Sequence, residues 1–408
     1  MRIAYLLDSF PSLSETFILN QITGLLDLGH EVDLFPQVVN IAGEQHPTVA
    51  AYGLMERVVA LAPPNGKGQR ALGLPTLLLR GLSRNPVTTL RALDPRRHGR
   101  RALSLRVLYG TVPFLGSKRR YDVVHAHYGI NGLRGVALKQ DGAIEAPLVV
   151  TFHGYDLRAA ETDDPEWLLP LRSGADRIIA ISEWSRERLE RLGMDPSRIV
   201  IHPIGIDLLE FPWEERASGL PKEESAPVRL LTVARLAPEK GLDLGLRALV
   251  EVAANLPPGK VHWEIVGSGP EKEELTQLIS TLGLEDRVTM TGGLSQPEVR
   301  GRFAQADLFF LPSRAEVTPT VLLEAQAMGL PVLATGVGAV SEVVLNGSSG
   351  TVVPPNDVAA LADALKALIG APERWPGMGE AGRRFVEGKH DIRRLNKQLE
   401  TIFQDVQV

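Results

Sequence analysis

Two glutamates stand eight positions apart in the segment SRAEVTPTVLLEAQAMGL, residues 313–330. A carboxylate accepts two charge-assisted hydrogen bonds, so the hydroxyl pairs of a sugar or a ribose are natural partners. We expect one of the two, Glu316 or Glu324, to bind sugar hydroxyls and the other ribose hydroxyls. Thr318 and Pro319 suit the N-cap and first turn of a helix, whose free N–H groups would hold a phosphate. Spacing alone fits equally well a solvated loop acid followed by an ordinary helical glutamate.

Two cations and a glycine-containing turn follow strand-like segments in the same half of the chain. Arg235 and Lys240, in VARLAPEKG, could flank a diphosphate, the first through its planar guanidinium and the second as a point charge. The turn VGSGP contains Gly267, Gly269 and Pro270, and glycines there permit close approach of a base or a ribose. As isolated features, the two cations are ordinary surface charges, and such turns are common in α/β proteins.

Histidines end two strand-like segments in the first half of the chain. His153 lies in VVTFHGYDL, which also contains Asp156, and His127 lies in VVHAHYG. A histidine at a strand end can hydrogen-bond to a sugar hydroxyl, or it can be a satisfied core residue. For His127, we leave open a role that only shapes an acceptor pocket.

The opening segment DSFPSLSETFILNQI is rich in hydroxyl groups. Ser12 and Glu15 have the spacing of a capping box. The following helix could present N–H groups to a phosphate or an acceptor, with Ser14, Glu15 and Thr16 beside it. A purely capping role fits the pattern as well.

The elements that must position these residues alternate between strands and helices. Short β-branched runs are separated by amphipathic segments of helical period, which predicts parallel sheets with crossover helices. The expected strands are 2–7, 30–35, 122–127, 147–154, 176–182 and 198–203, then 228–234, 261–267, 288–293, 307–313, 331–335 and 350–354. The clearest expected helices are 14–29, 242–256, 271–283 and 357–370.

The chain is too long, at 408 residues, for one ordinary core. The strand and helix pattern breaks into a polar, proline-containing run after Asp207. We expect an N-terminal Rossmann-like domain over 1–207, a linker over 208–227, a C-terminal Rossmann-like domain over 228–390 and a helix over 391–408 that packs back on the first domain. The fold class is therefore α/β, with two doubly wound parallel sheets that face a cleft.

Composition excludes some classes of chemistry. Cysteine is absent, so a disulfide framework, a thiolate nucleophile and a cysteine-based metal site are excluded. The N-terminus lacks the pattern of a secretory signal, and no window reaches the roughly 18 apolar residues of a membrane span. We expect a cytoplasmic protein that does not bind nucleic acid, with no metal and no cofactor.

One stretch is strongly basic. Between Lys67 and Arg120 many arginines are interleaved with leucines and valines, and Asp94 is the single acid. Such a surface, over Arg80 to Arg120, could attach the protein peripherally to the anionic inner face of the cell membrane or bind an acidic acceptor. Solvated arginine faces on packed helices are the alternative.

The 313–330 segment resembles the signature of glycosyltransferase family 4, a retaining family of GT-B fold. In that signature, two glutamates eight positions apart precede a Gly-x-Pro-Val strand, here GLPVLAT, and VARLAPEKG matches the family's V-x-R-x-x-x-x-K-G motif. The Ser-Glu-Thr-Phe run is similar to exopolysaccharide members of the colanic-acid type. Val317, where a glycine often stands, and the loop GVGAVSEVV depart from the pattern and leave the donor sugar open.

The resemblance implies a metal-independent hexosyltransferase in cell-surface polysaccharide or glycoconjugate synthesis. It would use a nucleotide diphosphate sugar such as a UDP-sugar, with a glycan, lipid-linked or small-molecule acceptor. It implies catalytic roles for His153, Arg235, Lys240 and Glu316, donor binding by Gly267, Gly269, Pro270, Thr318, Pro319, Thr320 and Glu324, and an acceptor or phosphate loop with Ser14, Glu15, Thr16, His127 and Asp156. A nucleotide-sugar epimerase, a phosphorylase and a non-catalytic carbohydrate- or membrane-binding scaffold are the alternatives.

Overall fold

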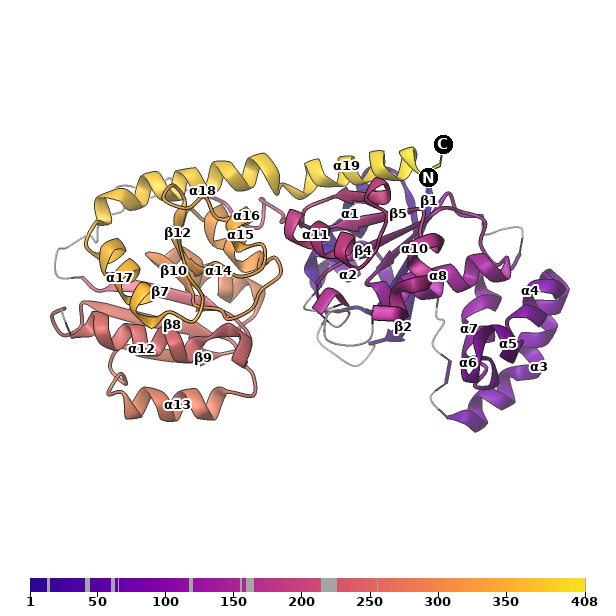
Figure 1. The fold of residues 1–408 in the computed structure, drawn as a ribbon, viewed down its shortest axis with the longest axis horizontal. Coiled ribbons are helices and arrows are strands. Elements are labelled where there is room, and N and C mark those ends of the chain that lie inside the picture. The colour runs from indigo at the N-terminus through magenta and orange to yellow at the C-terminus, as the bar shows by residue number, and fades with distance from the viewer. Residues whose placement is uncertain are drawn as a thin grey trace. The chain divides into compact units, whose positions relative to one another are not determined.

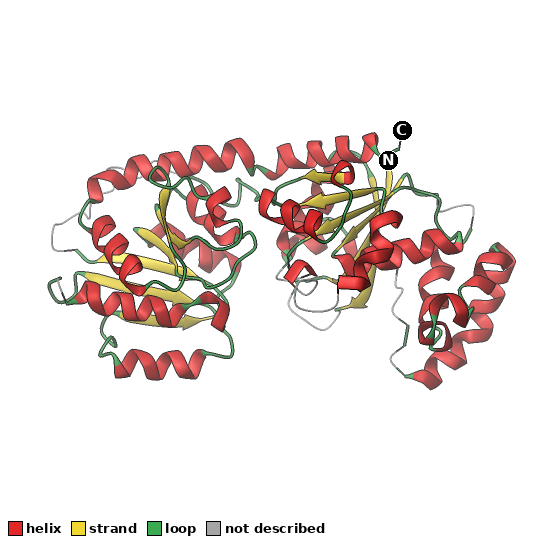
Figure 2. Ribbon diagram, viewed as in Figure 1, coloured by secondary structure: helices red, strands yellow, loops and turns green. Residues whose placement is uncertain are grey.

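The computed structural model describes residues 1–12, 15–40, 45–59, 63–64, 66–116, 120–154, 156–158, 165–213, 226–254 and 256–407. The chain forms two compact units, each built on one parallel sheet (Figure 1, Figure 2). Unit 1 comprises residues 1–181, 185–202 and 393–408, and unit 2 comprises 182–184 and 203–392. Within the described residues, no helix has both the length and the apolar content that a membrane crossing needs.

Unit 1 contains a six-stranded parallel sheet in the order β2-β1-β3-β4-β5-β6. Its strands are β1 (Arg2–Phe10), β2 (Glu31–Val39), β3 (Val123–His127), β4 (Leu148–Phe152), β5 (Arg177–Ala180) and β6 (Ile199–Ile201). Strands β3 and β4 are buried at every residue. This burial explains their nearly continuous apolar sequences, because a parallel sheet is covered on both faces.

Helices pack on both faces of this sheet. They include α1 (Thr16–Asp27), α2 (Pro47–Ala51), α8 (Gly129–Asp141), α10 (Leu169–Gly174), α11 (Glu183–Arg191) and α19 (Ile392–Asp405). Although α19 ends the chain, its Leu399 and Phe403 are fully buried in a core with Ile3 and Tyr5 of β1. The C-terminal helix is thus an integral part of unit 1.

A helical insert lies between β2 and β3. It contains α3 (Lys67–Arg84), α4 (Pro86–Arg91), α5 (Pro95–His98), α6 (Arg100–Leu103) and α7 (Arg106–Thr111). Ala92, Leu108 and Val112 form its own small core. His98 attaches the insert to α8, because its Nε2 lies 2.8 Å from Oδ2 of the buried Asp141.

Unit 2 repeats the architecture with the order β12-β11-β10-β7-β8-β9. Its strands are β7 (Val228–Val233), β8 (Val261–Val266), β9 (Val288–Gly292), β10 (Leu308–Leu311), β11 (Val332–Thr335) and β12 (Gly350–Val353). Its helices are α12 (Leu242–Ala253), α13 (Lys272–Thr281), α14 (Gln296–Gln305), α15 (Thr320–Ala327), α16 (Val340–Val343), α17 (Val358–Ile369) and α18 (Trp375–Lys389). Trp263, fully buried on β8, packs against Phe310 of β10 at the centre of one face.

The predicted fold class is confirmed, and each of the twelve expected strands has its counterpart in the sheets. The division between the units falls after His202, whereas the sequence break led us to place it after Asp207. The difference arises because Ile206 and Phe211 are buried in the core of unit 2. Most of the expected linker, residues 214–225, lies outside the described residues.

Candidate functional site

Glu316 is the centre of a charged cluster at the carboxyl end of the unit 2 sheet. Its Oε1 accepts hydrogen bonds from Lys240 Nζ and from Ser313 Oγ, each at 2.7 Å. Glu316 is only 8% exposed. Among the described residues, no hydrogen bond to its Oε2 is present. The second carboxylate oxygen is therefore available to a hydroxyl group of a ligand.

Backbone contacts hold the Glu316 loop from two sides. Gly241 has a positive φ of 58°, and a Cβ atom there would lie 2.2 Å from the Pro312 carbonyl oxygen. Gly338 also has a φ of 58°, and its Cβ would lie 2.2 Å from the Glu316 carbonyl oxygen. The neighbouring Ala339 N–H donates to the Val317 carbonyl at 2.7 Å. Only glycine satisfies both the backbone conformation and the close approach.

Helix α15 follows this loop, and its start differs from our expectation. The helix begins at Thr320 with Pro319 as N-cap, one residue later than the helix that the sequence predicts with Thr318 as N-cap. The φ of Pro319, −73°, is close to the value that the proline ring imposes and would suit a helix. Its ψ of 104° is extended, so Pro319 precedes the helix. Thr318 Oγ1 is buried without a hydrogen-bond partner. An unpaired hydroxyl beside the free N–H groups of a helix start is an arrangement that suits an anion.

Glu324 lies one turn into α15 and is strongly desolvated. Burial, and to a smaller extent the charge of Glu210, raises the pKa of its carboxyl to about 7. Among the described residues it has no hydrogen-bonding side-chain partner. Burial keeps this carboxyl group partly protonated. Hydrogen bonds donated by a ligand would stabilise its ionised form and so lower its pKa.

Arg235 is exposed and forms an ion pair with Glu239, a residue that the sequence pattern did not single out. The Arg235 loop lies against the turn that contains Gly267 and Gly269. A Cβ at these glycines would lie 1.8 Å from the Ala234 carbonyl oxygen and 2.2 Å from that of Leu236, respectively. Both glycines therefore allow a close approach of the backbone beside Arg235, and the close approach of a base or a ribose stays a prediction. Pro270 is exposed after them.

Unit 1 brings His127 and His153 together. His127 Nδ1 and His153 Nε2 are 2.8 Å apart, and the rings stack at 5.0 Å. His127 is fully buried, whereas His153 as a whole residue is half-buried. Burial lowers the pKa of His153 to about 3 and that of His127 well below its usual value. Both imidazoles are therefore neutral, and one must donate to the other.

Glu15 accepts a hydrogen bond from Tyr128 Oη at 2.8 Å. Its burial raises the pKa of its carboxyl, and the hydrogen bonds from Tyr128 and Ser12 oppose this effect. The capping box expected from Ser12 and Glu15 is absent, because α1 begins at Thr16 with Glu15 as N-cap. Ser14 lies outside the described residues. No sequence pattern singles out Tyr128, which has a positive φ of 69° and is the N-cap residue of α8.

Asp156 organises the turn after β4. Its Oδ1 accepts from the N–H groups of His153, Gly154 and Leu157, and its Oδ2 accepts from Gly129 N–H at the start of α8. Burial raises the pKa of this carboxyl, and the four backbone hydrogen bonds lower it. The arrangement fixes the backbone of His153, so Asp156 acts on the site through its neighbour.

Two family models together match most of the chain. The model described as Glycosyltransferase Family 4 matches residues 14–209, and the model described as Glycosyl transferases group 1 matches residues 214–385. The second match contains Lys240, Glu316 and Glu324.

Full-length relatives and solved structures agree with these matches. The Escherichia coli K12 protein named "Putative colanic acid biosynthesis glycosyltransferase WcaL" is 32% identical, over 99% of this chain and 100% of its own. The Erwinia amylovora amylovoran biosynthesis glycosyltransferase AmsK is 27% identical over 99% of both chains. Anabaena HepE, solved in complex with UDP, is 20% identical with a TM-score of 0.69 and covers 99% of this chain and 100% of its own. Sucrose-phosphate synthase from Thermosynechococcus elongatus has a TM-score of 0.70 at 20% identity, over 100% and 99% of the two chains.

Replacement of Gly338 by alanine should destabilise unit 2. The new Cβ must displace the Glu316 carbonyl oxygen, and alanine is strained at this φ, so we expect a loss of about 1–3 kcal/mol in the free energy of unfolding. Urea denaturation measures the loss. Gly301→Ala in α14, where a Cβ meets no atom within 4 Å, is the control and should be neutral or stabilising. Equal stability of the two variants would contradict this account of the loop.

Glu324→Gln should stabilise the protein more at pH 8 than at pH 4. The folded carboxyl has a pKa of about 7 against an ordinary value of 4.5, so the folded state binds more protons between these values. The free energy of unfolding therefore falls as pH rises through that window, and a residue that does not titrate escapes the loss. Urea denaturation at several pH values tests this, with the exposed Glu373→Gln as control. A pH-independent difference between variant and wild type would refute the assigned titration.

Proposed function

The chain belongs to glycosyltransferase family 4 and has the GT-B fold, and from this premise we propose a retaining transfer of a hexose-type sugar from a nucleotide diphosphate sugar to a glycan, glycolipid or small-molecule acceptor. The observation that carries the proposal is the cluster of Lys240, Ser313 and Glu316 beside the start of α15. It combines a cation, an accessible carboxylate oxygen and free N–H groups in one place.

Relatives support a role in exopolysaccharide synthesis. WcaL and AmsK match along essentially the whole chain, and their names refer to the polysaccharides colanic acid and amylovoran. A nucleotide-sugar donor has support of its own, because HepE was also solved in complex with UDP-glucose. We propose a UDP-sugar as the first donor to test.

The donor would exchange the internal ion pairs for pairs with the ligand. Lys240 now pairs with Glu316, and Arg235 with Glu239. A diphosphate offers both cations a stronger anion, while Glu316 accepts from sugar hydroxyls and Glu324 from the ribose diol. Thr318 Oγ1, which has no partner now, would donate to a phosphate oxygen.

The transfer step requires charge stabilisation on the leaving group. The bond from the anomeric carbon to the diphosphate oxygen breaks, and both electrons stay with the diphosphate. The acceptor oxygen forms its bond to the anomeric carbon on the same face, and its proton passes to the departing phosphate. Lys240, Arg235 and the α15 N-terminus stabilise the negative charge, so no divalent ion is needed in this proposal. Glu316 orients the sugar, and neutral His153 accepts or donates a hydrogen bond at the reacting face.

Lys240→Ala and Arg235→Ala should reduce transfer about 10²- to 10³-fold, because each removes a charge that stabilises the leaving diphosphate. Thermal shift with UDP and UDP-glucose, with and without EDTA, measures donor binding, and UDP release in the presence of a membrane extract measures transfer. Lys272→Ala, which changes an exposed lysine of α13, is the matched control.

Several outcomes would overturn the proposal. Near-normal UDP release by both variants would contradict the proposed role of Lys240 and Arg235 in stabilising the leaving group. Loss of transfer activity in EDTA would contradict a metal-independent reaction. Epimerised donor or phosphorolysis in incubations without the extract would replace transfer by one of the other reactions that such folds perform.

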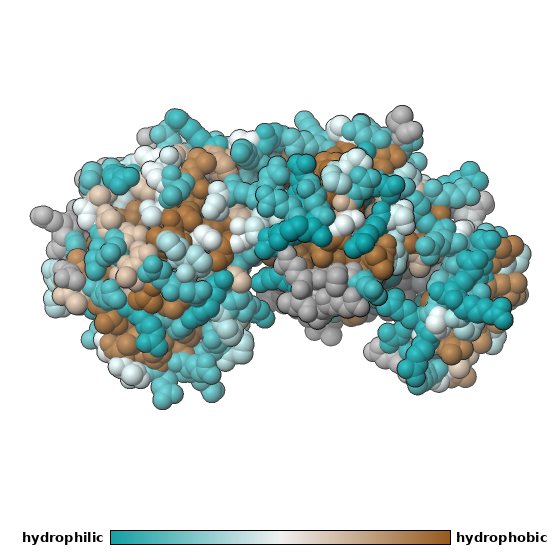
Figure 3. Space-filling view, in the orientation of Figure 1, coloured by the Kyte–Doolittle hydropathy of each residue, from teal (hydrophilic) through white to brown (hydrophobic). Residues whose placement is uncertain are grey.

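We also propose a peripheral position at the cytoplasmic face of the membrane, through the helical insert. On α3, Leu72 and Leu79 are 83% and 73% exposed, and the exposed Arg80 and Arg84 lie on the same helix. Figure 3 shows apolar atoms next to hydrophilic ones over this part of unit 1. Leucines that insert at the lipid interface, with arginines at the headgroups, form the usual arrangement of an interfacial helix.

Sedimentation with vesicles tests this position. The protein should bind phosphatidylglycerol-containing vesicles, and high salt should weaken the binding because each arginine contributes about 1 kcal/mol near an anionic surface. Leu72→Ser with Leu79→Ser, and separately Arg80→Gln with Arg84→Gln, should each reduce the bound fraction severalfold. Absence of binding at low salt, or equal binding of both double variants and the wild type, would exclude the insert as the membrane contact.

A further inference from the structure

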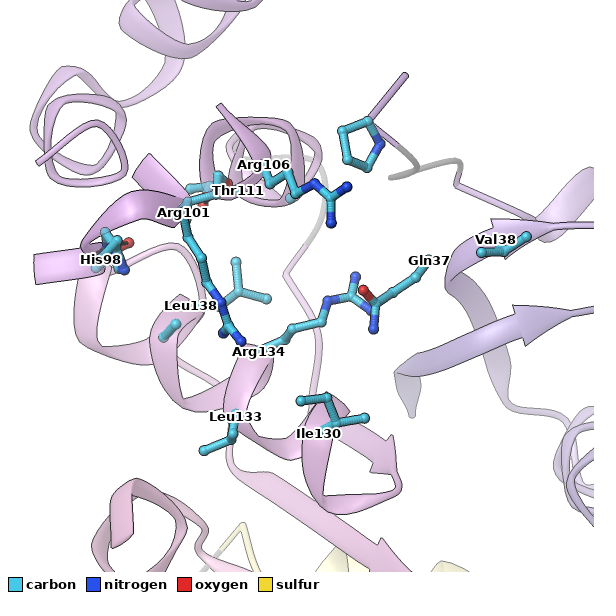
Figure 4. Close-up of a pocket in the computed structure, with 15 residues that line it drawn as sticks. Gln37, Val38, His98, Arg101, Arg106, Thr111, Ile130, Leu133, Arg134 and Leu138 are labelled. Atoms are coloured by element: carbon cyan, nitrogen blue, oxygen red, sulfur yellow. Dashed lines mark hydrogen bonds and ion pairs between the residues drawn. The ribbon is translucent and has the colours of Figure 1, made fainter. Parts of the chain in front are cut away.

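Unit 1 contains a second candidate site, made of residues to which the family resemblance assigns no role. A cavity of about 350 Å³ lies between the helical insert and α8 (Figure 4). Arg101 and Arg106 enter it from α6 and α7, Arg134 from α8, and Gln37 from the end of β2. Its volume is within the range of small-molecule sites, which is about 300–1,000 Å³.

The cavity is strongly cationic. Figure 4 shows the side chains of Arg101, Arg106 and Arg134 around one hollow, with Arg134 directed towards Gln37. Among the described residues that line it, Asp141 is the only acid, and its carboxylate is paired with His98. The three arginines have no carboxylate within salt-bridge distance in the described part of the chain. Three guanidinium groups that line one hollow give it a positive potential, which favours the binding of an anion.

Arg134 is the most constrained of the three. Burial lowers the pKa of its guanidinium to about 10, and the charge of Asp8 opposes this shift. Its hydrogen bonds within the described chain come from Nη1 alone, to Asn131 Oδ1 at 3.0 Å and to the Leu7 carbonyl at 3.4 Å. Nε and Nη2 therefore keep their donor capacity for a ligand.

The rest of the lining is apolar. Ile130, Leu133, Ala137 and Leu138 form one wall on α8, and Val107 faces them from α7. A free inorganic anion gains nothing from such walls, whereas a purely apolar ligand would leave three guanidinium groups without a counter-ion. The lining matches a molecule with an anionic head and an apolar chain.

Hydrogen bonds connect the cavity to the histidine pair. Asn131 accepts from both Gln37 Nε2 and Arg134 Nη1 at 3.0 Å. Its own Nδ2 donates to the His127 carbonyl at 2.9 Å. His127 in turn contacts His153. A head group bound by Arg134 would therefore be connected through Asn131 and His127 to His153, the side chain that we propose to contact the sugar.

We infer that this cavity binds a lipid phosphate or diphosphate, which presents the acceptor in the proposed transfer. The role of the bound lipid as acceptor rests on the proposed function, whereas its binding in the cavity requires neither the donor nor the reaction. The arginines hold the phosphate groups, and the α8 wall holds the first part of the apolar chain.

Calorimetric titration of the full chain tests the site with three probes. Farnesyl diphosphate should bind at least tenfold more tightly than inorganic pyrophosphate, which lacks the chain, and than farnesol, which lacks the charge. Arg101→Gln with Arg106→Gln should weaken farnesyl diphosphate binding at least tenfold, and both residues are exposed, so the fold should be retained. Arg96→Gln with Arg100→Gln changes two exposed arginines of the same insert outside the cavity and should leave the affinity unchanged.

UDP binding, measured on the same samples, separates the two proposals. Normal UDP binding with equal farnesyl diphosphate affinity in both double variants overturns the lipid phosphate site alone. Equal affinity for pyrophosphate would mean a site for free phosphate anions, and equal affinity for farnesol would mean a merely apolar pocket. Loss of UDP binding by the wild type would instead refute the proposed function.

Discussion

The candidate donor site depends on backbone packing at the strand ends of unit 2. Gly241 approaches Pro312, Gly338 approaches Glu316, and Gly267 approaches Ala234, in each case at a distance that leaves no room for a Cβ. These contacts join the loops after β7, β8, β10 and β11 into one layer. The charged side chains on this layer extend from a backbone that these close contacts hold in place, so their positions are well defined.

That rigidity has an electrostatic consequence. Lys240 and Glu316 are held at 2.7 Å with little water around the carboxylate. A pair of this kind contributes little net stability, because desolvation offsets the attraction. In the proposed function, the pair keeps both side chains at the candidate donor site before a ligand arrives, and donor binding then exchanges the internal pair for contacts with the ligand.

The sequence predicted the sheets well, for one physical reason, and the donor-binding role of the residues at the strand ends stays a prediction. Buried parallel strands require continuous apolar runs, and functional groups then stand at the ends of those runs, as Glu316 and His153 do. The local starts of helices were predicted less well. Thr318 and Ser12 have the chemistry of caps, but α15 begins after Pro319 and α1 after Glu15. Thr318 Oγ1 stays unpaired in a buried position, whereas the Ser12 side chain hydrogen-bonds to the Glu15 carboxylate. Local spacing contains no information on that choice.

Side chains that meet through the fold were beyond sequence reasoning. Tyr128 and Glu15 are separated by 113 positions, and Arg106 and Arg134 belong to different elements whose packing no periodicity reveals. The sequence of the insert predicts a basic amphipathic surface, because its arginines are interleaved with leucines. In the structure the stretch divides into two kinds of arginine. Arg80 and Arg84 share α3 with the exposed Leu72 and Leu79. Arg101 of α6 and Arg106 of α7 instead line a cavity with the half-buried Arg134 of α8. Charge composition alone assigns both kinds to one surface, and only the packing of the insert on α8 separates the proposed membrane contact from the proposed binding site.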